Sequence, residues 1–277
     1  MSKQGKKQDM GSGSIPKLML NLAIPAVVAQ LINMLYNIVD RIYIGHIPDA
    51  GASALTGVGL FLPILMMINA FAMLAGSGGA PRAAIAMGKN DKDSAEKILG
   101  NCFSVLLIFS VVLTVLFYIF APQLLRLFGA SDVTLPYALS YARIYILGTV
   151  FVMIVMGMNP FITTQGFAKF SMITTVVGAV LNIILDPILI FGFHMGVRGA
   201  AIATVASQAV SAVWVLSFLK GSKTLLLLKV SNMKLIGKII FPCLGLGIST
   251  FVMLSTESIL NISFNSSLSR YGGDVAV

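Results

Sequence analysis

The stretch that decides the fold is residues 105–121, which read VLLIFSVVLTVLFYIFA and carry no charge. Shorter charge-free runs cover residues 144–158 and 173–185. These runs approach the ~20 residues that a helix needs to cross the hydrocarbon core of a bilayer. In the whole chain 57% of residues are hydrophobic and only 10% are charged, and the mean hydropathy is +0.92. Such a chain cannot bury its apolar surface by folding in water, so its solvent is lipid.

Apolar runs and the residues that interrupt them predict seven transmembrane helices. Alternating strand patterns are absent, and an open sheet would leave backbone groups unpaired in lipid. We therefore expect an all-α membrane protein in which a six-helix transmembrane lobe is followed by a seventh helix that begins a second, incomplete lobe. The predicted helices cover residues 17–44, 53–80, 95–120, 135–160, 170–192, 197–219 and 235–260.

The basic residues predict the orientation of these helices. Assigning the loops alternately to two sides splits the 19 basic residues 14 to 5, and every lysine falls on one side. An excess of Lys and Arg marks the cytoplasmic side of a membrane protein. We expect a multi-pass plasma-membrane protein with a cytoplasmic amino terminus, in which residues 1–14 form a disordered cytoplasmic tail.

The net charge of +9 and the two cysteines could suggest other chemistry. A nucleic-acid partner needs a basic patch with stacking aromatics on a soluble surface, and this apolar chain offers none. Cys102 and Cys243 both lie in apolar segments and are interpreted as small core residues, so neither a disulfide nor a metal site is expected. No cofactor is expected either.

An internal repeat divides the chain. Residues 15–25 and 232–242 align without gaps, so that Pro25 matches Pro242, and the same offset carries Asp40 onto Glu257. Copies separated by an even number of spans are typical of a parallel repeat. The predicted units are the six-helix lobe at 15–220, a cytoplasmic linker at 221–234, and the first helix of a truncated second lobe at 235–277.

Polar residues interrupt the first predicted helix at spacings of three and four, which places them on one face. A stripe of this kind is costly against lipid, so it should face the bundle interior or a water-filled cavity. The alternative for Asp40 is a solvated acid at the helix end, paired with Arg41. The stripe consists of Gln30, Asn33, Tyr36, Asn37 and Asp40.

The fifth predicted helix carries a second intramembrane acid, Asp186, four residues after Asn182. An acid in apolar surroundings favours its uncharged form unless a cation neutralises it, which is the behaviour of a proton or sodium carrier. Its alternative is an acid that hydrogen-bonds at the break before Pro187. The sixth helix adds a polar face, either interhelical contact or substrate site, at Thr204, Ser207, Gln208 and Ser211.

These residues resemble the multidrug and toxic compound extrusion (MATE) family, in particular its DNA-damage-inducible F-like branch. The resemblance extends over essentially the whole chain. It rests on Ile24-Pro25 through Asn37-Ile-Val-Asp40, on residues 49–55, on the motif LNIILDP at 181–187 and on GVRGAAIA at 196–203.

The resemblance implies two six-helix lobes that face each other across a cleft and export amphipathic or cationic drugs in exchange for H⁺ or Na⁺. Asp40 and Asp186 would then bind the proton or a sodium ion, and Pro25 would be the bending point of the first helix. Tyr36, Asn182 and Thr204 would complete the ion site. The substrate cleft would include Gln30, Asn33, Asn37 and Gln208. Because the family has twelve helices, the chain would lack its C-terminal lobe.

Three other functions stay open at this point. A related lipid-linked oligosaccharide flippase would need a cleft lined by basic residues, and few cations lie within these helices. An intramembrane aspartyl hydrolase could use the two acids as a dyad, but the Gly-x-Gly-Asp context is missing. A non-transporting remnant is the third. We therefore expect a transporter and no enzymatic activity.

The lysine asymmetry makes a topology prediction. Cysteines introduced at Asn90 and Ser222, in two loops predicted to be cytoplasmic, should resist membrane-impermeant thiol reagents in whole cells and react after permeabilisation. Ready labelling of both positions from outside would reverse the orientation.

Overall fold

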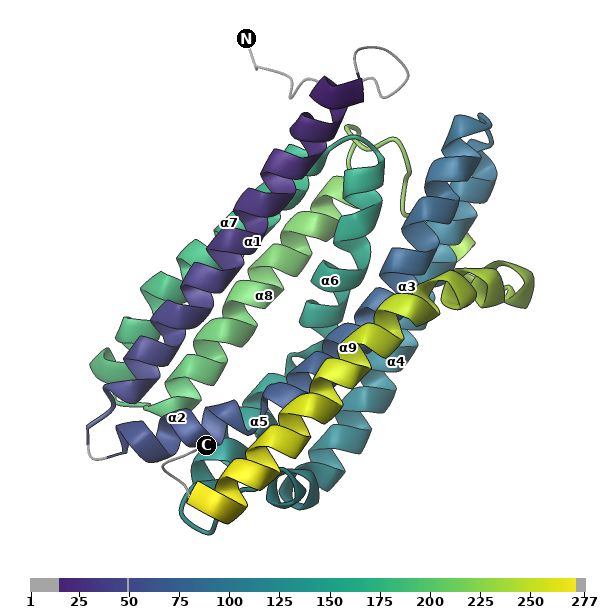
Figure 1. Ribbon diagram of the computed structural model, residues 1–277. Coiled ribbons are helices and arrows are strands. Elements are labelled where there is room, and N and C mark those ends of the chain that lie inside the picture. The colour runs from purple at the N-terminus through teal and green to yellow at the C-terminus, as the bar shows by residue number, and fades with distance from the viewer. Residues whose placement is uncertain (1–14, 49, 273–277) are drawn as a thin grey trace.

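The computed structural model describes residues 15–48 and 50–272, and in this part of the chain every regular element is a helix (Figure 1). The predicted tail at 1–14 and the last five residues lie outside the described residues. The helices are α1 Ile15–Gly45, α2 Gly51–Gly59, α3 Leu62–Gly88, α4 Lys92–Leu127, α5 Leu135–Leu147, α6 Thr149–Thr164, α7 Ala168–Pro187, the π-helix η1 Ile188–Gly192, α8 Val197–Lys220, the 3₁₀ helix η2 Val230–Met233 and α9 Gly237–Gly272.

The membrane class is confirmed. Among the described residues, six helical segments are long and apolar enough to cross a bilayer, or seven when the bent pair α5–α6 counts as one span. The segments match the predicted helices in number and order. Helices α2 and α3 together form one of them, across a two-residue turn at 60–61. The last helix runs further than predicted, to Gly272 rather than to residue 260.

The prediction of one continuous helix over 135–160 is wrong. The chain bends by 58° between α5 and α6, at Gly148. A Cβ atom at Gly148 would lie 2.6 Å from a methyl carbon of Val205 on α8, so the glycine lets α8 approach the bend. Glycine also weakens a helix interior, which favours a break at this position.

Apolar side chains are divided between a core and an outer surface. Large side chains with less than 2% of their surface exposed fill the centre of the bundle, among them Phe61, Leu106 and Phe161. Others point outward along α1, α4 and α9, where they would contact lipid tails. Examples on α1 are Val27, Leu31, Met34, Leu35, Ile38 and Ile42.

Helix α9 lies along α3 and touches α4 (Figure 1). The two backbones are close, because a Cβ atom at Gly78 would overlap the carbonyl oxygen of Cys243. Gly247 is in the same relation to the carbonyl oxygen of Leu74. Small residues allow this close approach of membrane helices. Hydroxyl groups add to it, since Ser258 donates to the carbonyl oxygen of Pro63 at 2.9 Å.

Helices α7 and α8 share an aromatic stack. The ring centroids of Phe170 and Trp214 are 5.3 Å apart and their planes differ by 16°, and Phe218 extends the stack from α8. Trp214 is the single tryptophan of the chain. The stack therefore joins the two helices at the end opposite to η1.

The close approach of α3 and α9 makes Gly78→Ala destabilising. The added methyl group meets backbone that cannot move aside, and overpacking of this kind costs about 1–3 kcal/mol. Gly59→Ala is the matched control, because a Cβ atom there has nothing within 4 Å. Thermal unfolding of the purified protein in detergent should show a lower midpoint for Gly78→Ala and an unchanged or higher one for Gly59→Ala. Equal midpoints would contradict the packing described here.

Candidate functional site

The polar face of α1 turns toward the bundle over most of its length. Asn33 and Tyr36 line a cavity, Gln30 lies at its exposed edge, and Asp40 is buried with 9% of its surface exposed. Asn37 lies at the edge of this face and does not line the cavity. Its side chain is exposed and donates to the carbonyl oxygen of Asn33 at 2.6 Å.

A buried hydrogen-bond network connects α7 to α8. The Nδ2 group of Asn182 donates to Oδ1 of Asp186 at 3.3 Å and to the hydroxyl of Thr204 at 3.4 Å. The Thr204 hydroxyl in turn donates to the carbonyl oxygen of Ala200 at 3.0 Å. Asp186 has no exposed surface. The Asn182 amide therefore holds the carboxyl of Asp186 against α8.

The carboxyl groups of Asp40 and Asp186 are close enough to interact across the contact between α1 and α7. Each acid has one buried oxygen without a hydrogen-bond partner, Oδ1 in Asp40 and Oδ2 in Asp186. The Oδ1 atom of Asn182 is also buried and unpaired. Two buried carboxylates in contact cannot both stay charged without a proton or a cation to compensate them. The pair is therefore a place where a positive charge is stabilised.

The alternative in which Asp40 is a solvated acid paired with Arg41 does not match the geometry. Asp40 is buried, whereas Arg41 is exposed. The ion pairs found among the described residues do not include these two.

An aromatic wall beside the carboxyl pair was not foreseen. The Tyr141 side chain is buried and lies close to Asp40 and to the Thr204 hydroxyl. Tyr145 stacks on Tyr141 with ring centroids 5.8 Å apart, and Phe61 meets Tyr145 edge-on at 5.1 Å. The four-residue spacing of the two tyrosines was the available signal, but it is equally typical of an ordinary core.

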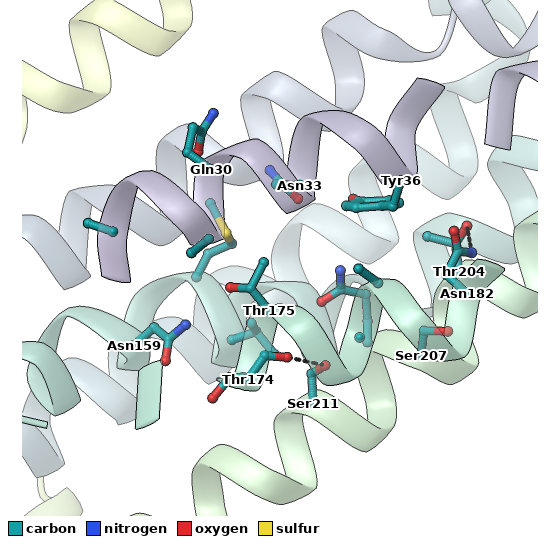
Figure 2. Close-up of a pocket in the computed structure, with 17 residues that line it drawn as sticks. Gln30, Asn33, Tyr36, Asn159, Thr174, Thr175, Asn182, Thr204, Ser207 and Ser211 are labelled. Atoms are coloured by element: carbon teal, nitrogen blue, oxygen red, sulfur yellow. Dashed lines mark hydrogen bonds between the residues drawn. The ribbon is translucent and has the colours of Figure 1, made fainter. Parts of the chain in front are cut away.

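A cavity of about 170 Å³ opens between α1, α6, α7 and α8 (Figure 2). Tyr36, Asn182, Thr204 and Ser207 lie at one end of it, and Asn159 lies at the other. None of the residues that line it is charged. Its polar lining residues are Gln30, Asn33, Tyr36, Asn159, Thr174, Thr175, Asn182, Thr204, Ser207, Gln208 and Ser211.

Several polar atoms around this cavity are buried and unpaired. They are acceptor oxygens of Asn159, Asn182 and Gln208 and the hydroxyl of Ser207. Buried acceptors without partners are costly, so they favour a guest that brings hydrogen-bond donors. Of the predicted cleft residues, Gln30, Asn33 and Gln208 belong to the lining, and Asn159 and Ser207 join them.

A transition-metal centre has no counterpart in residues 15–48 and 50–272. No group of three or more His, Cys, Asp or Glu side chains comes together there. His46 and His194 are exposed on loops.

Known proteins of similar sequence include several that are named multidrug export proteins. The chain is 28% identical over 259 residues to the multidrug export protein MepA of Staphylococcus haemolyticus, in a match that covers 94% of this chain and 57% of that protein. The MepA protein of Staphylococcus saprophyticus is 27% identical over 261 residues, with the same two shares. The chain thus spans a little over half the length of these relatives.

Solved structures of similar fold include multidrug transporters, and a family model matches the part of the chain that contains both acids. The MATE multidrug transporter DinF-BH is 36% identical and superposes with a TM-score of 0.90, covering 98% of this chain and 60% of that chain. An inward-facing MATE transporter of the MOP superfamily is 28% identical, with a TM-score of 0.82 over 91% of this chain and 58% of its own. The family model named MatE matches residues 25–188, a range that contains α1 from its proline, the bend at Gly148 and both acids. The chain belongs to the MatE family.

Proposed function

We propose that this chain is the ion-binding lobe, together with the first helix of the following lobe, of a multidrug antiporter that works by alternating access. The observation that carries the proposal is the contact between two buried carboxyl groups, Asp40 and Asp186, beside a polar, uncharged cavity. The proposed domains are the six-helix lobe at 15–220, the cytoplasmic linker at 221–234 and the beginning of a second lobe at 235–277. The likeness to DinF-BH supports placing the chain near the DNA-damage-inducible F-like branch.

The coupling ion is the proton or Na⁺, bound by the carboxyl pair. A proton would neutralise one acid and let it donate to the other. A sodium ion would find oxygen ligands in Asp40, Asp186, Asn182 and Thr204, the type of ligand that hard cations prefer. Tyr36 lines the cavity next to these groups and would close the ion site toward it. Binding of either cation removes the repulsion between the acids, so α1 and α7 are held together more strongly in the loaded state.

Pro25 is the proposed bending point of α1. The proline lies within α1 and has no N–H group, so the carbonyl oxygen of Asn21 loses its usual helical partner. Asp40 lies fifteen residues further along the same helix, at the ion site. A change in the ionisation of Asp40 therefore acts on one end of a helix that is already weakened near the other end.

The cavity is the proposed drug-binding surface of this lobe, and Gln30, Asn33 and Gln208 belong to it. Its unpaired oxygens favour molecules with N–H or O–H donors, which suits amphipathic and cationic drugs. The similar MepA proteins are named as multidrug export proteins, which supports drugs as the substrates. Asn37 does not line the cavity, so we propose that it contacts the substrate at the edge of the cleft.

The lipid-linked oligosaccharide flippase is the weaker alternative. Recognition of a diphosphate headgroup needs basic side chains, and none lines the cavity. An intramembrane hydrolase is not favoured either, since the MatE family is a family of transporters.

Removing the carboxyl pair should abolish coupling. We expect Asp40→Asn and Asp186→Asn to insert and fold normally, and to lose drug export driven by a proton or sodium gradient in vesicles containing a transporter extended by the second lobe. In the purified chain of 277 residues, infrared difference spectra recorded across a pH titration should lose the carboxylic-acid signal of the pair. Asp132→Asn is the matched control, because 96% of the Asp132 side chain is exposed, far from the carboxyl pair. Full gradient-driven export by the Asp40→Asn and Asp186→Asn double variant would show that the acids are structural.

Drug export from cells should require a second lobe in addition to residues 1–277. The chain can satisfy its backbone and pack through small residues by itself, so residues 1–277 should insert in the membrane. A cleft between two lobes needs both of them to open and close. We expect a pump-deficient strain that expresses residues 1–277 to remain drug-sensitive, while a strain expressing the chain extended by five more helices becomes resistant. Resistance from the shorter chain would overturn the requirement for two lobes.

A further inference from the structure

The segment between α8 and α9 has little regular structure, yet side chains of the six-helix unit bind its backbone at several points along its length. This connecting segment comprises residues 221–236 and contains only the short helix η2. Irregular backbone that is buried must still find hydrogen-bond partners. Leu226 and Leu228 are buried, with 0% and 5% of their surface exposed, so the segment is partly inside the protein.

Gln165, at the end of α6, binds the first part of the segment. Its Oε1 atom accepts from the Thr224 hydroxyl at 2.7 Å, from the N–H of Leu225 at 2.8 Å and from the N–H of Leu226 at 3.0 Å. Its Nε2 group donates to the carbonyl oxygen of Phe161 at 3.0 Å, which fixes the amide orientation. Gln165 itself is only 3% exposed.

Glu96, near the start of α4, binds the middle of the segment. Its carboxylate accepts from the N–H of Leu227 at 3.2 Å and forms an ion pair with Lys229 at 2.6 Å. Lys92 lies 3.7 Å from the same carboxylate. Only 2% of the Glu96 side chain is exposed, and its buried charge is compensated by Lys229 of the segment and by Lys92 of its own helix.

Asn101 binds the last part, one to two turns further along α4. Its Oδ1 accepts from the N–H of Ile236 at 2.7 Å, and its Nδ2 donates to the carbonyl oxygen of Asn232 at 3.2 Å. The segment lies directly on α4 here, because a Cβ atom at Gly100 would overlap the Asn232 carbonyl oxygen.

The hydrogen bonds from side chains to the segment end at Ile236, one residue before α9 begins. Helix α9 then packs on the six-helix unit at once, because Ile239 and Ile240 lie against its core and the carbonyl oxygen of Cys243 lies against Gly78. The segment therefore sets the position from which α9 meets α3.

We propose that Glu96, Asn101 and Gln165 are positioning residues that hold residues 224–236 as a fixed part of the six-helix unit, so that α8 and α9 are joined by a rigid segment and not by a flexible linker. This rigid segment, the bracket, fixes where α9 begins against α3 and α4. This holds whichever molecule the protein transports.

Hydrogen–deuterium exchange of the purified chain in detergent tests the bracket. The amides of Leu225, Leu226 and Ile236 should exchange at least about tenfold more slowly than those of the exposed Ser222 and Lys223 in the same segment. Gln165→Leu should raise the exchange of Leu225 and Leu226 by about tenfold and leave Ile236 unchanged. Gln165→Glu is the matched control, because its carboxylate still accepts from all three donors and loses only the donation to the carbonyl oxygen of Phe161. If Gln165→Leu does not fold, Asn101→Leu should release Ile236 alone.

Exchange at Leu225 and Leu226 as fast as at Ser222, or unaltered by Gln165→Leu, would overturn the bracket. Spin-label distances give a second test, in a background with Cys102→Ala and Cys243→Ala. The pair at Val230 and Ile108 should give one narrow distance, and Gln165→Leu together with Asn101→Leu should broaden it. A broad distribution without these two substitutions would show that the segment is flexible and overturn the bracket.

Discussion

A polar group in hydrocarbon has no water to bind, so it must find its partner within the protein. This constraint explains two main features of the described part of the chain, the regular helices and the hydrogen bonds to the one long irregular segment. The backbone is helical wherever it faces lipid, and the irregular segment after α8 lies where side chains such as Gln165 and Asn101 replace the missing helical partners. The one region where buried oxygens stay unpaired in numbers, among the described residues, is the space around Asp40, Asp186 and the adjoining cavity. The need to pair every buried polar group thus shapes the fold, and the unpaired oxygens indicate where an ion or a ligand with hydrogen-bond donors would bind.

The sequence contained enough information to predict the helices but not their interruptions. Charge-free runs of the length of a bilayer leave no alternative to helices, so the number and order of the spans followed directly. The bend at Gly148 could not be foreseen, because it depends on Val205 of a distant helix occupying the space that a side chain would need. Continuation of α9 to Gly272 was missed for the opposite reason, since its polar end reads as a loop when only hydropathy is considered.

The same division applies to the candidate site. Helical spacing placed Asn33, Tyr36 and Asp40 on one face of α1, and Asn182 and Asp186 on one face of α7, because both faces are set by local geometry. That these two faces meet, and that Tyr141 lies beside Asp40, depends on the packing of α1, α5, α7 and α8. Glu96 gave no signal, because a single acid near the start of a helix is usually a solvated side chain. Gln165 was ambiguous from the sequence, since an isolated amide fits an interhelical contact as well as a substrate site.

The stack of Phe170 and Trp214 has a practical consequence for optical spectroscopy. Trp214 is the only indole in the chain, and it joins the helix that carries Asp186 to the helix that carries Thr204. Its emission therefore comes from one defined place, without contributions from other tryptophans. A change in how α7 lies against α8 alters the environment of this ring directly, so the protein carries its own fluorescent reporter for the two helices that carry Asp186 and Thr204.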